Sequence, residues 1–228
     1  MKYIAVITCD IKYSKKLISI RAHWFKRLRE IFDYINKNYE ILEKEIEIVR
    51  GDNFQFTLKQ PENALKVALL IKAHLLSIDL KKFNKKKESL DRIDARIAIG
   101  IGTNNFTSNK MYESDGDAYW RSGKLLDELK KKNQSIGIRT GIRNIDDELE
   151  VLTSLADVII NKWSIQMAEV VKLVLMGTQK QSELSEALNI SQPSVHERLK
   201  GAGFYQIWEY ENRFSYLLNS VFKNKSLK

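Results

Sequence analysis

The stretch from Glu45 to Leu58 has the pattern of a β-hairpin, and it limits the folds open to this chain more than any other segment. Apolar residues alternate with polar ones around a Gly-Asp-Asn turn: Ile46 and Ile48 before it, and Phe54, Phe56 and Leu58 after it. Such alternation gives one apolar face that must pack against a core. The turn holds Asp52 at the tip of the hairpin, and Asp10 ends the strand expected over residues 3–9. Two aspartates at strand ends can share a cation.

The periodicity around this hairpin predicts an α+β domain. Residues 3–9 have few polar positions, as in a central strand that is covered on both faces. The elements then follow in the order β-α-β-β-α-β-α-β, and the last strand is expected over residues 135–140. Between them lie a helix marked by Trp24, Leu28, Ile31 and Ile35, the hairpin, a helix that begins at Pro61, a strand over 95–101 and a helix that follows Gly116. Small residues on one face of the strand over 95–101 let a helix or a ligand approach closely.

Three short motifs resemble those of one bacterial family. Cys-Asp-Ile-Lys-Tyr-Ser begins at Cys9, Arg-Gly-Asp-Asn-Phe-Gln begins at Arg50, and Gly-Asp-Ala-Tyr-Trp-Arg begins at Gly116. With the order of the elements, these motifs resemble the SatD family, and residues 1–142 resemble the class III nucleotidyl cyclase fold. The resemblance implies a ferredoxin-like βαββαβ sheet domain.

The same resemblance implies a metal and nucleotide site. In the cyclases two aspartates bind divalent metals that hold a nucleoside triphosphate, and Asp10 and Asp52 match these positions. The backbone carbonyl of Ile11 would be a further metal ligand. Mg²⁺ prefers such oxygen donors, so Mg²⁺ and a nucleotide are the cofactors that the resemblance implies. The candidate nucleotide-binding residues are Lys12, Ser14 and Lys124.

Four positions depart from the cyclase pattern. Trp120 and Lys124 replace the asparagine and arginine of the transition-state site, Tyr13 replaces a phosphate-binding glycine, and Ile48 replaces a purine-selecting lysine. Lysine lacks the forked donor geometry of arginine, and losing one transition-state donor slows chemistry by ~10² to 10³-fold. We therefore expect metal or nucleotide binding without efficient cyclisation, and we assign no catalytic residue. A structural role for Asp52 is the alternative.

The pattern becomes continuously helical after the sheet domain, which divides the chain into three parts. Residues 1–142 form the cyclase-like domain, residues 143–176 a helical connector, and residues 177–228 an all-α helix-turn-helix domain. The connector has a wide apolar face, which favours burial on the sheet domain or pairing with a second chain over a free linker.

A helix-turn-helix motif is expected over residues 178–200. Two short helices over 181–188 and 192–200 flank a turn, and Ser191 is the N-cap of the second helix. The pattern resembles the helix-turn-helix of bacterial transcription regulators, whose second helix enters the major groove. The candidate DNA-binding residues are Gln192, Ser194, His196 and Arg198, which are expected on the exposed face, and Lys200, which with Lys180 would meet phosphate. The alternative is a helical pair for dimerisation or protein contact, because from Val151 onward nine Lys and Arg face seven Asp and Glu.

Composition restricts the setting in which such a protein works. The formal charge of +9 fits an acidic partner, although lysine runs at 81–87 and 130–132 are also typical of solvated loops and helix ends. The longest apolar runs are shorter than the ~18 residues of a membrane span, so we expect a cytoplasmic protein without a membrane partner. Cys9 is the lone cysteine, which fits a reducing compartment, and we expect a buried structural thiol.

These observations favour one functional hypothesis over two others. The principal hypothesis is a homodimeric, DNA-binding transcriptional regulator whose cyclase-like domain senses a ligand or mediates dimerisation. The first alternative is an Mg²⁺-dependent nucleotidyl cyclase or nucleotidyltransferase with a regulatory helical tail. The second is a protein-interaction scaffold that binds no nucleic acid.

Overall fold

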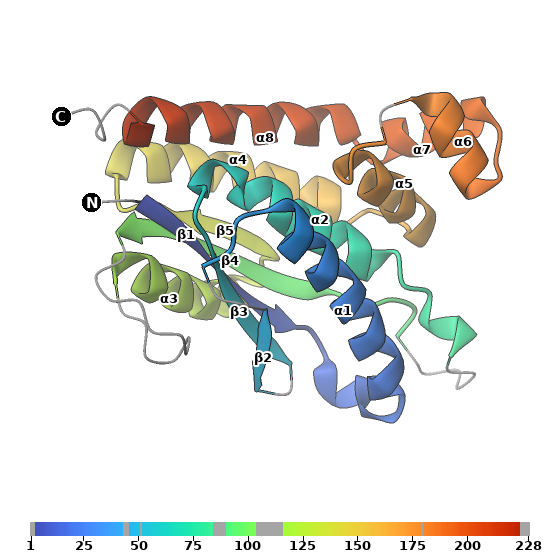
Figure 1. The fold of residues 1–228 in the computed structure, drawn as a ribbon, viewed down its shortest axis with the longest axis horizontal. Helices are drawn as coiled ribbons and strands as arrows, with labels where there is room; N and C mark the ends of the chain where they lie inside the picture. Colours follow the sequence, from blue (N-terminus) through green and yellow to red (C-terminus); the bar gives the residue numbers. More distant parts are fainter. Residues whose placement is uncertain are drawn as a thin grey trace.

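The computed structural model describes residues 3–42, 46–50, 52–83, 90–103, 116–178 and 180–223. Five strands form one sheet in the order β2-β3-β1-β4-β5 (Figure 1). Their bounds are β1 Tyr3–Ile11, β2 Glu47–Arg50, β3 Asn53–Leu58, β4 Ala95–Thr103 and β5 Ile136–Arg139. The near-continuous apolar strand β1 lies at the centre, as its sequence predicts.

The sheet is mixed, because β1 pairs antiparallel with β3 and β4 whereas β4 pairs parallel with β5. The expected hairpin is present, with β2 antiparallel to β3 at the edge of the sheet. Strands β1 to β4 and the helices between them make the βαββαβ unit, and one further helix and β5 extend it. The α+β prediction is therefore confirmed for the sheet region.

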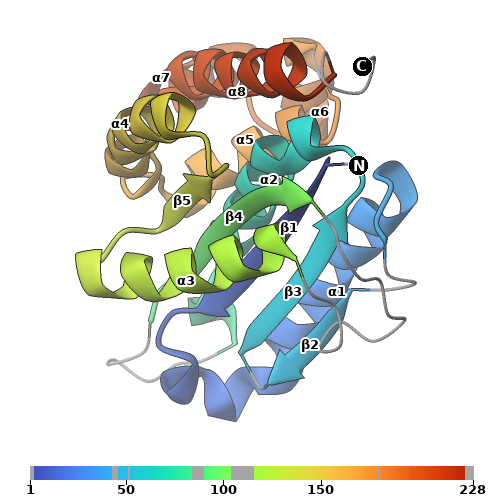
Figure 2. The same cartoon turned by 90° about the vertical axis from the view of Figure 1, so that its left-hand side faces the viewer.

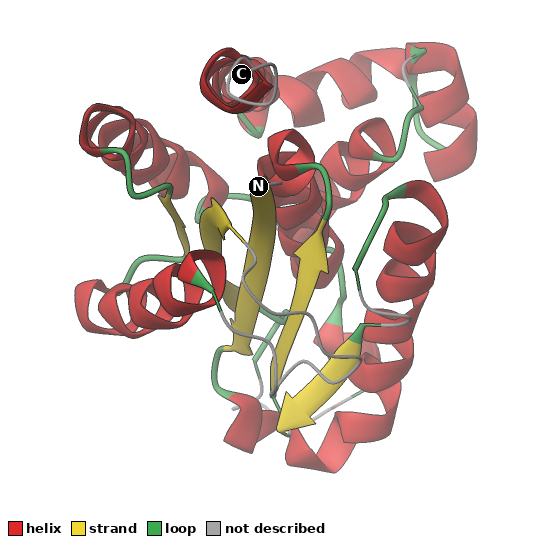
Figure 3. Cartoon of the chain, turned by 60° about the vertical axis from the view of Figure 1, so that its left-hand side comes forward, coloured by secondary structure: helices red, strands yellow, loops and turns green. Residues whose placement is uncertain are grey.

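Helices cover both faces of this sheet (Figures 2 and 3). Helices α1 (Arg21–Asn38) and α2 (Ala64–Leu76) lie on one face, and α3 (Asp117–Lys132) lies on the other. Successive side chains of a strand point to opposite faces. The side chains of β1 divide accordingly: Ile7, Cys9 and Ile11 pack in the core with α1 and α2, and Ile4 and Val6 pack with Ala118 of α3.

The small residues of β4 allow α3 to approach the sheet closely. A Cβ atom on Gly102 would lie 2.7 Å from the backbone nitrogen of Ala118, and one on Gly100 would collide with the backbone oxygen of the same residue. The small-residue face of β4 is therefore occupied by a helix and not by a ligand.

In the described part of the chain, five α-helices follow the sheet, and they share its core. They are α4 (Arg143–Ile160), α5 (Ile165–Leu175), α6 (Gln181–Leu188), α7 (Gln192–Gly201) and α8 (Phe204–Leu218). Helix α5 packs on α2, and one buried hydrophobic cluster runs from β1 to α8. Trp163, between α4 and α5, is fully buried and donates its indole N–H to the Ala202 carbonyl at 2.7 Å. The predicted burial of the connector is confirmed, whereas the three-part domain division stays a prediction.

A buried ionic cluster joins the sheet to these helices, and its members are Lys12, Lys72, Asp94, Ser135 and Asp157. The Lys72 ammonium is fully buried and contacts Asp94, and it also donates to the Ala95 carbonyl at 2.9 Å. The Lys12 ammonium lies 2.8 Å from the other Asp94 oxygen and 2.7 Å from the Ser135 hydroxyl. The Ser135 backbone N–H in turn donates to the carboxylate of Asp157 on α4. Burial lowers the pKa of Lys72 to about 8, although Asp94 opposes this shift.

One expectation about the site segments changes in the structure. Asp10 lies within β1 and does not follow it, because the strand pairing continues through Asp10 and Ile11. Gly51 of the hairpin turn and the lysines at 85–87 lie outside the described residues.

Within the described ranges no helix has the length and apolar content that crossing a bilayer requires. The Cys9 thiol is buried, and this burial raises its pKa, which fits the expected structural role.

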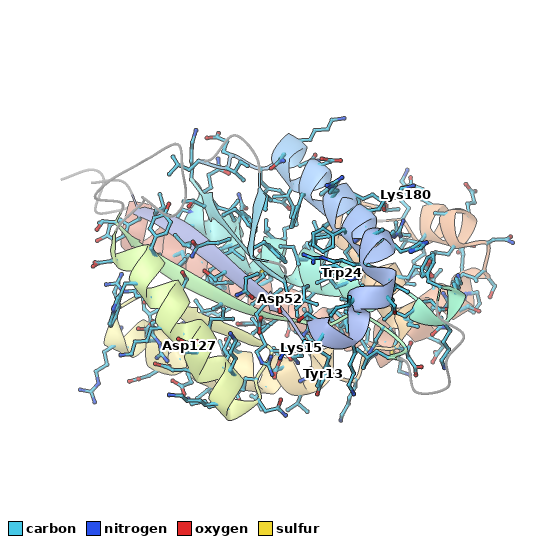
Figure 4. All side chains as sticks on the ribbon, turned by 90° about the horizontal axis from the view of Figure 1, so that it is seen from below. Tyr13, Lys15, Trp24, Asp52, Asp127 and Lys180 are labelled. Carbon is cyan, nitrogen blue, oxygen red and sulfur yellow. The ribbon has the colours of Figure 1, made fainter. Side chains whose placement is uncertain are left out.

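Removing the carboxylate of the ionic cluster should destabilise the fold. In Asp94→Ala, the buried Lys72 ammonium and Lys12 both lose their anion, and breaking a buried pair in this way costs about 3–5 kcal/mol. Urea denaturation at pH 7 measures the unfolding free energy. The matched control is Asp127→Ala on the exposed side of α3 (Figure 4), which should change it by less than about 0.5 kcal/mol. Equal stability of the two variants would contradict a stabilising role for Asp94.

His74 should make the fold less stable in mild acid. This side chain on α2 is buried and donates from Nε2 to the Arg27 carbonyl at 2.7 Å, and burial lowers its pKa from 6.5 to about 4. Between these two pKa values the unfolded chain binds the proton and the folded chain does not, so stability falls as the pH decreases from about 6.5 to 4. In His74→Gln, the loss of unfolding free energy between pH 7 and pH 5 should shrink by about 1–2 kcal/mol. An unchanged pH profile of urea denaturation would exclude this contribution.

Candidate functional site

Asp10 is enclosed by three neighbouring elements. Its Cα pairs with Asn53 on β3 and with Arg96 on β4, and its side chain is largely buried. The Asp10 carboxylate lies 3.5 Å from the Arg96 guanidinium and 3.7 Å from the Lys130 ammonium at the end of α3. Both distances exceed those of a close charge-assisted hydrogen bond. The two basic side chains therefore screen Asp10 without holding it tightly.

The electrostatics of Asp10 favour an additional cation. Burial is the largest influence and raises the pKa of Asp10, and the negative charge of Asp52 raises it further. Lys130 and Arg96 act in the opposite direction, but the net pKa remains above the ordinary value for an aspartate. When the pKa of a carboxyl group is raised in this way, a positive charge beside the group stabilises its ionised form.

The hairpin tip is tied directly to the end of β1. The backbone N–H of Ile11 donates to the Asp52 carbonyl at 3.0 Å, and the Ser14 hydroxyl donates to the Asp52 carboxylate at 2.5 Å. Asp52 also lines a cavity of about 230 Å³ with Ser14, Lys15, Ile18, Arg21 and Trp24 (Figure 4). This volume is below the ~300–1,000 Å³ of most small-molecule pockets, so the cavity has room for only part of a nucleotide.

Asn53 adds a buried oxygen beside Asp10. Among the residues that the structure describes, its amide oxygen has no hydrogen-bond partner, and Asn53 lies directly across from Asp10 in the strand register. A buried polar atom without a partner is unusual and calls for an explanation. Opposite residues of an antiparallel pair present their side chains on the same face of the sheet. Asn53 is therefore positioned to supply an oxygen donor beside Asp10.

We define the cradle as Asp10, Asp52, Asn53 and the backbone of Ile11. Its donors are oxygens only, which fits a hard cation such as Mg²⁺. Among the described residues, no three His, Cys, Asp or Glu side chains cluster closely enough to hold a metal. Because Mg²⁺ typically keeps several waters and uses one or two protein carboxylates together with substrate phosphates, the two carboxylates of the cradle are sufficient.

The three predicted nucleotide-binding residues lie in different places. Ser14 contacts Asp52, as described above. Lys12 is directed into the ionic cluster, where its ammonium contacts Asp94 and Ser135. Lys124 is exposed on α3, with its ammonium 4.8 Å from the ring centroid of the exposed Trp120. The structure thus brings only Ser14 together with a predicted metal ligand.

Tyr13 has the backbone conformation that usually requires glycine. Its φ and ψ of 56° and 29° lie in the left-handed region, which costs an ordinary residue roughly 1–2 kcal/mol. Its side chain is 63% exposed and contacts Lys16. The loop after β1 therefore keeps a glycine-like path at the position where the cyclase pattern has a glycine, although the side chain is a tyrosine.

The two short helices predicted on either side of a turn are present as α6 and α7. Asn189 ends α6 in the left-handed conformation, and the Ser191 hydroxyl caps α7 by accepting from the Ser194 N–H at 3.4 Å. The Ser185 hydroxyl donates to the Ile190 carbonyl at 2.5 Å and closes the turn. Val195 and Leu199 are the buried side chains of α7.

Only three of the five predicted DNA-binding residues lie on the outer face of α7. Gln192, His196 and Lys200 are exposed at four-residue intervals. Ser194 and Arg198 are half-buried, and Arg198 is directed toward Glu169 of α5 at 4.0 Å. The expectation of one common exposed face was wrong for these two, because a spacing of two residues turns a helical side chain by more than half a circle from the first.

The match of the chain to a family model covers residues 3–213, which is nearly the whole sequence. The description of that model is the SatD family. The chain belongs to the SatD family. No curated protein matches the sequence of this SatD family member.

Several solved cyclase structures are similar to part of the chain. An adenylate/guanylate cyclase/hydrolase from Silicibacter pomeroyi is 22% identical, with a TM-score of 0.39 over 55% of this chain and 69% of that one. An adenylate cyclase from Trypanosoma brucei is 15% identical, with a TM-score of 0.38 over 56% and 68%. A bacterial light-regulated adenylyl cyclase is 15% identical, with a TM-score of 0.41 over 62% and 44%. The sheet order remains the basis for the fold, because these TM-scores are below 0.5.

Three residues of the site were not anticipated from the sequence. Asn53 and Arg96 neighbour Asp10 through the strand register, which the alternating patterns of β3 and β4 would have indicated if the strands had been aligned on Asp10. Lys130 comes from the lysine run at 130–132, which was interpreted as a solvated helix end. No local signal marks Lys130, because its contact with Asp10 depends on how α3 crosses the sheet.

Proposed function

We propose that this SatD family protein is a DNA-binding regulator in which α6 and α7 form the DNA-binding unit. The observation that carries the proposal is the outward face of α7, where Gln192, His196 and Lys200 are all exposed on one side of a capped helix. This helix lies at an outer corner of the molecule (Figure 1). Helices α5, α6 and α8 pack against its other sides.

The side chains on this face suit contacts with both bases and phosphates. Glutamine pairs with adenine edges in the major groove, and lysine binds phosphate. Lys180, at the start of α6, adds a second exposed cation, although Glu183 lies 3.4 Å from it. Arg198 is partly occupied by Glu169, so its contribution to guanine recognition should be smaller than that of Gln192 to adenine recognition. The modest charge excess of this half implies few phosphate contacts and a shallow salt dependence.

Selection from a random DNA library at low salt should enrich a defined motif. Gln192→Ala should then weaken binding to that motif by about 1–3 kcal/mol, and Lys200→Ala should weaken binding to all sequences and reduce the salt slope by about 1. Gln206→Ala on α8 and Lys131→Ala on α3 are the matched controls, since both residues are exposed and neither lies on α7. If no sequence is enriched, DNA binding is excluded and the interaction scaffold is favoured.

A second candidate function is supported by the cradle. We propose that Asp10, Asp52 and Asn53, with the Ile11 carbonyl, hold Mg²⁺ together with the phosphates of a nucleotide, and that the bound state regulates the protein. The Asn53 amide oxygen without a partner is the specific observation in favour. A bound Mg²⁺ would neutralise phosphate charge. Efficient cyclisation is not expected, because Trp120 and Lys124 stack on each other where the cyclase pattern has its transition-state donors.

Calorimetric titration with Mg²⁺, with and without ATP or GTP, should detect binding to the cradle. Asp10→Asn, Asp52→Asn and Asn53→Ala should each weaken the affinity by about 10-fold to 100-fold, and the exposed Asp127→Asn should leave it unchanged. Affinity should fall at acidic pH, because protons compete for the Asp10 carboxylate. Equal affinities in all variants would exclude the cradle. Asp-dependent formation of a cyclic nucleotide would favour the cyclase alternative.

A further inference from the structure

Helix α4 has an apolar stripe on its outer side, in addition to its buried face. The stripe consists of Val151, Leu155 and Val158, whose side chains are 61%, 63% and 55% exposed. Their spacing of four and three residues places them in a row along one side of the helix. The opposite side of α4 is buried on the sheet and α8 through Leu149, Ala156 and Ile160.

The position of α4 leaves this stripe accessible. Figure 2 shows α4 on the outer side of the molecule, beside α8 and next to β5, which is an edge strand. Ion pairs hold the flanks of the helix in place: Arg213 of α8 lies 2.7 Å from Glu148, and Lys132 lies 2.9 Å from Glu150. The stripe is thus presented on a rigid helix with both flanks fixed by the rest of the chain.

The ends of the α4 stripe have opposite charges. Asp147 lies one turn before Val151 and is highly exposed, and the exposed Lys162 lies four residues after Val158, just beyond the end of the helix. Asp147 and Arg143 are both exposed, and their charged groups lie 4.0 Å apart. Replacing this contact with one to another chain therefore costs little free energy. Ser154, a small exposed residue, lies beside Leu155 at the middle of the stripe.

We propose that a second copy of this chain packs on the α4 stripe in an antiparallel orientation about a two-fold axis. The positions of the apolar residues and of the two charged ends are symmetric about the midpoint between Ser154 and Leu155. An antiparallel partner therefore places Val151 opposite Val158 of the other copy and Leu155 against the small Ser154, as an isologous interface requires. Asp147 then faces Lys162 of the other copy at both ends. A parallel pair would instead place like charges together, which is unfavourable.

The size of the stripe sets the expected strength of this dimer. Three aliphatic side chains and their flanks cover less than the roughly 800 Å² per partner of a standard stable interface. Dimerisation should therefore depend on concentration, with dissociation in the micromolar range or weaker. The inference is independent of both proposed functions, because no residue of the stripe belongs to the cradle or to the outer face of α7.

Sedimentation equilibrium of the full chain over a range of concentrations tests the proposal. The wild type should show a monomer–dimer equilibrium, and Leu155→Glu should weaken it by at least about tenfold, since it places a charge in the apolar centre. Ile18→Glu is the matched control, because Ile18 is an equally exposed aliphatic residue in the helical turn Ser14–Ile20 and not on α4. Far-UV circular dichroism and thermal melts verify that each variant is folded. A wild type that stays monomeric, or a dimer that Leu155→Glu leaves unchanged, would overturn the proposal.

Charge exchange at the two ends tests the antiparallel orientation. Asp147→Lys and Lys162→Asp should each weaken the dimer by about three- to tenfold, because two symmetric pairs become repulsive. The double variant should restore the wild-type affinity, and an equimolar mixture of the two single variants should form a heterodimer. In a parallel pair like charges already face each other in the wild type, so neither the single variants nor the double variant would change the affinity much, whereas the mixture would form a heterodimer in either orientation. Weakening by the single variants without rescue by the double variant would therefore exclude the antiparallel dimer.

Discussion

The contact of Asp94 with two lysines is the interaction on which the arrangement of this protein depends. Asp94 precedes β4 and binds the ammonium of Lys72 from α2 and that of Lys12 from the loop after β1. Ser135 and Asp157 extend the contact to β5 and α4. Charged groups with this little exposure persist only when they are paired and hydrogen-bonded. The ionic cluster therefore fixes how the sheet, α2 and the C-terminal helices meet.

The cradle begins at the edge of the same cluster. Asp10 and Lys12 are two residues apart, and the strand pleat sends one toward α3 while the loop directs the other toward Asp94. Tyr13 then follows in a left-handed conformation, so that Ser14 reaches Asp52 at the hairpin tip. The loop after β1 thus ties the hairpin tip to the end of the strand, even where the residue types differ from the cyclase pattern.

Periodicity was enough to predict the elements and their order, because the apolar faces of β1, β3 and α7 repeat at the intervals of strands and helices. The hairpin and the family resemblance predicted that Asp52 lies near Asp10, and the negative charge of Asp52 does raise the pKa of Asp10, whereas a shared metal stays a prediction. The sequence did not predict that Lys12 contacts Asp94 and that Arg198 is directed toward Glu169. A long basic side chain can turn toward either of two partners, and only the tertiary packing decides between them. The positions of Asn53 and Lys130 beside Asp10 were likewise not predicted, because the first depends on the strand register and the second on how α3 crosses the sheet.

The docking of α5 on α2 restricts how a ligand in the cradle could influence DNA binding. Helix α2 belongs to the core of the sheet, and α5 belongs to the same hydrophobic cluster as α7. Trp163 is fully buried between α4 and α5, and Val195 and Leu199 of α7 belong to the same buried cluster, so moving α7 away from the other helices would expose apolar surface. A signal from Asp10 or Asp52 would have to travel through packed elements with two alternative arrangements. One contiguous chain of contacts runs from Lys12, beside the cradle, through Ser135 to Asp157 of α4, and on that helix the proposed dimer would respond to a shift of these residues.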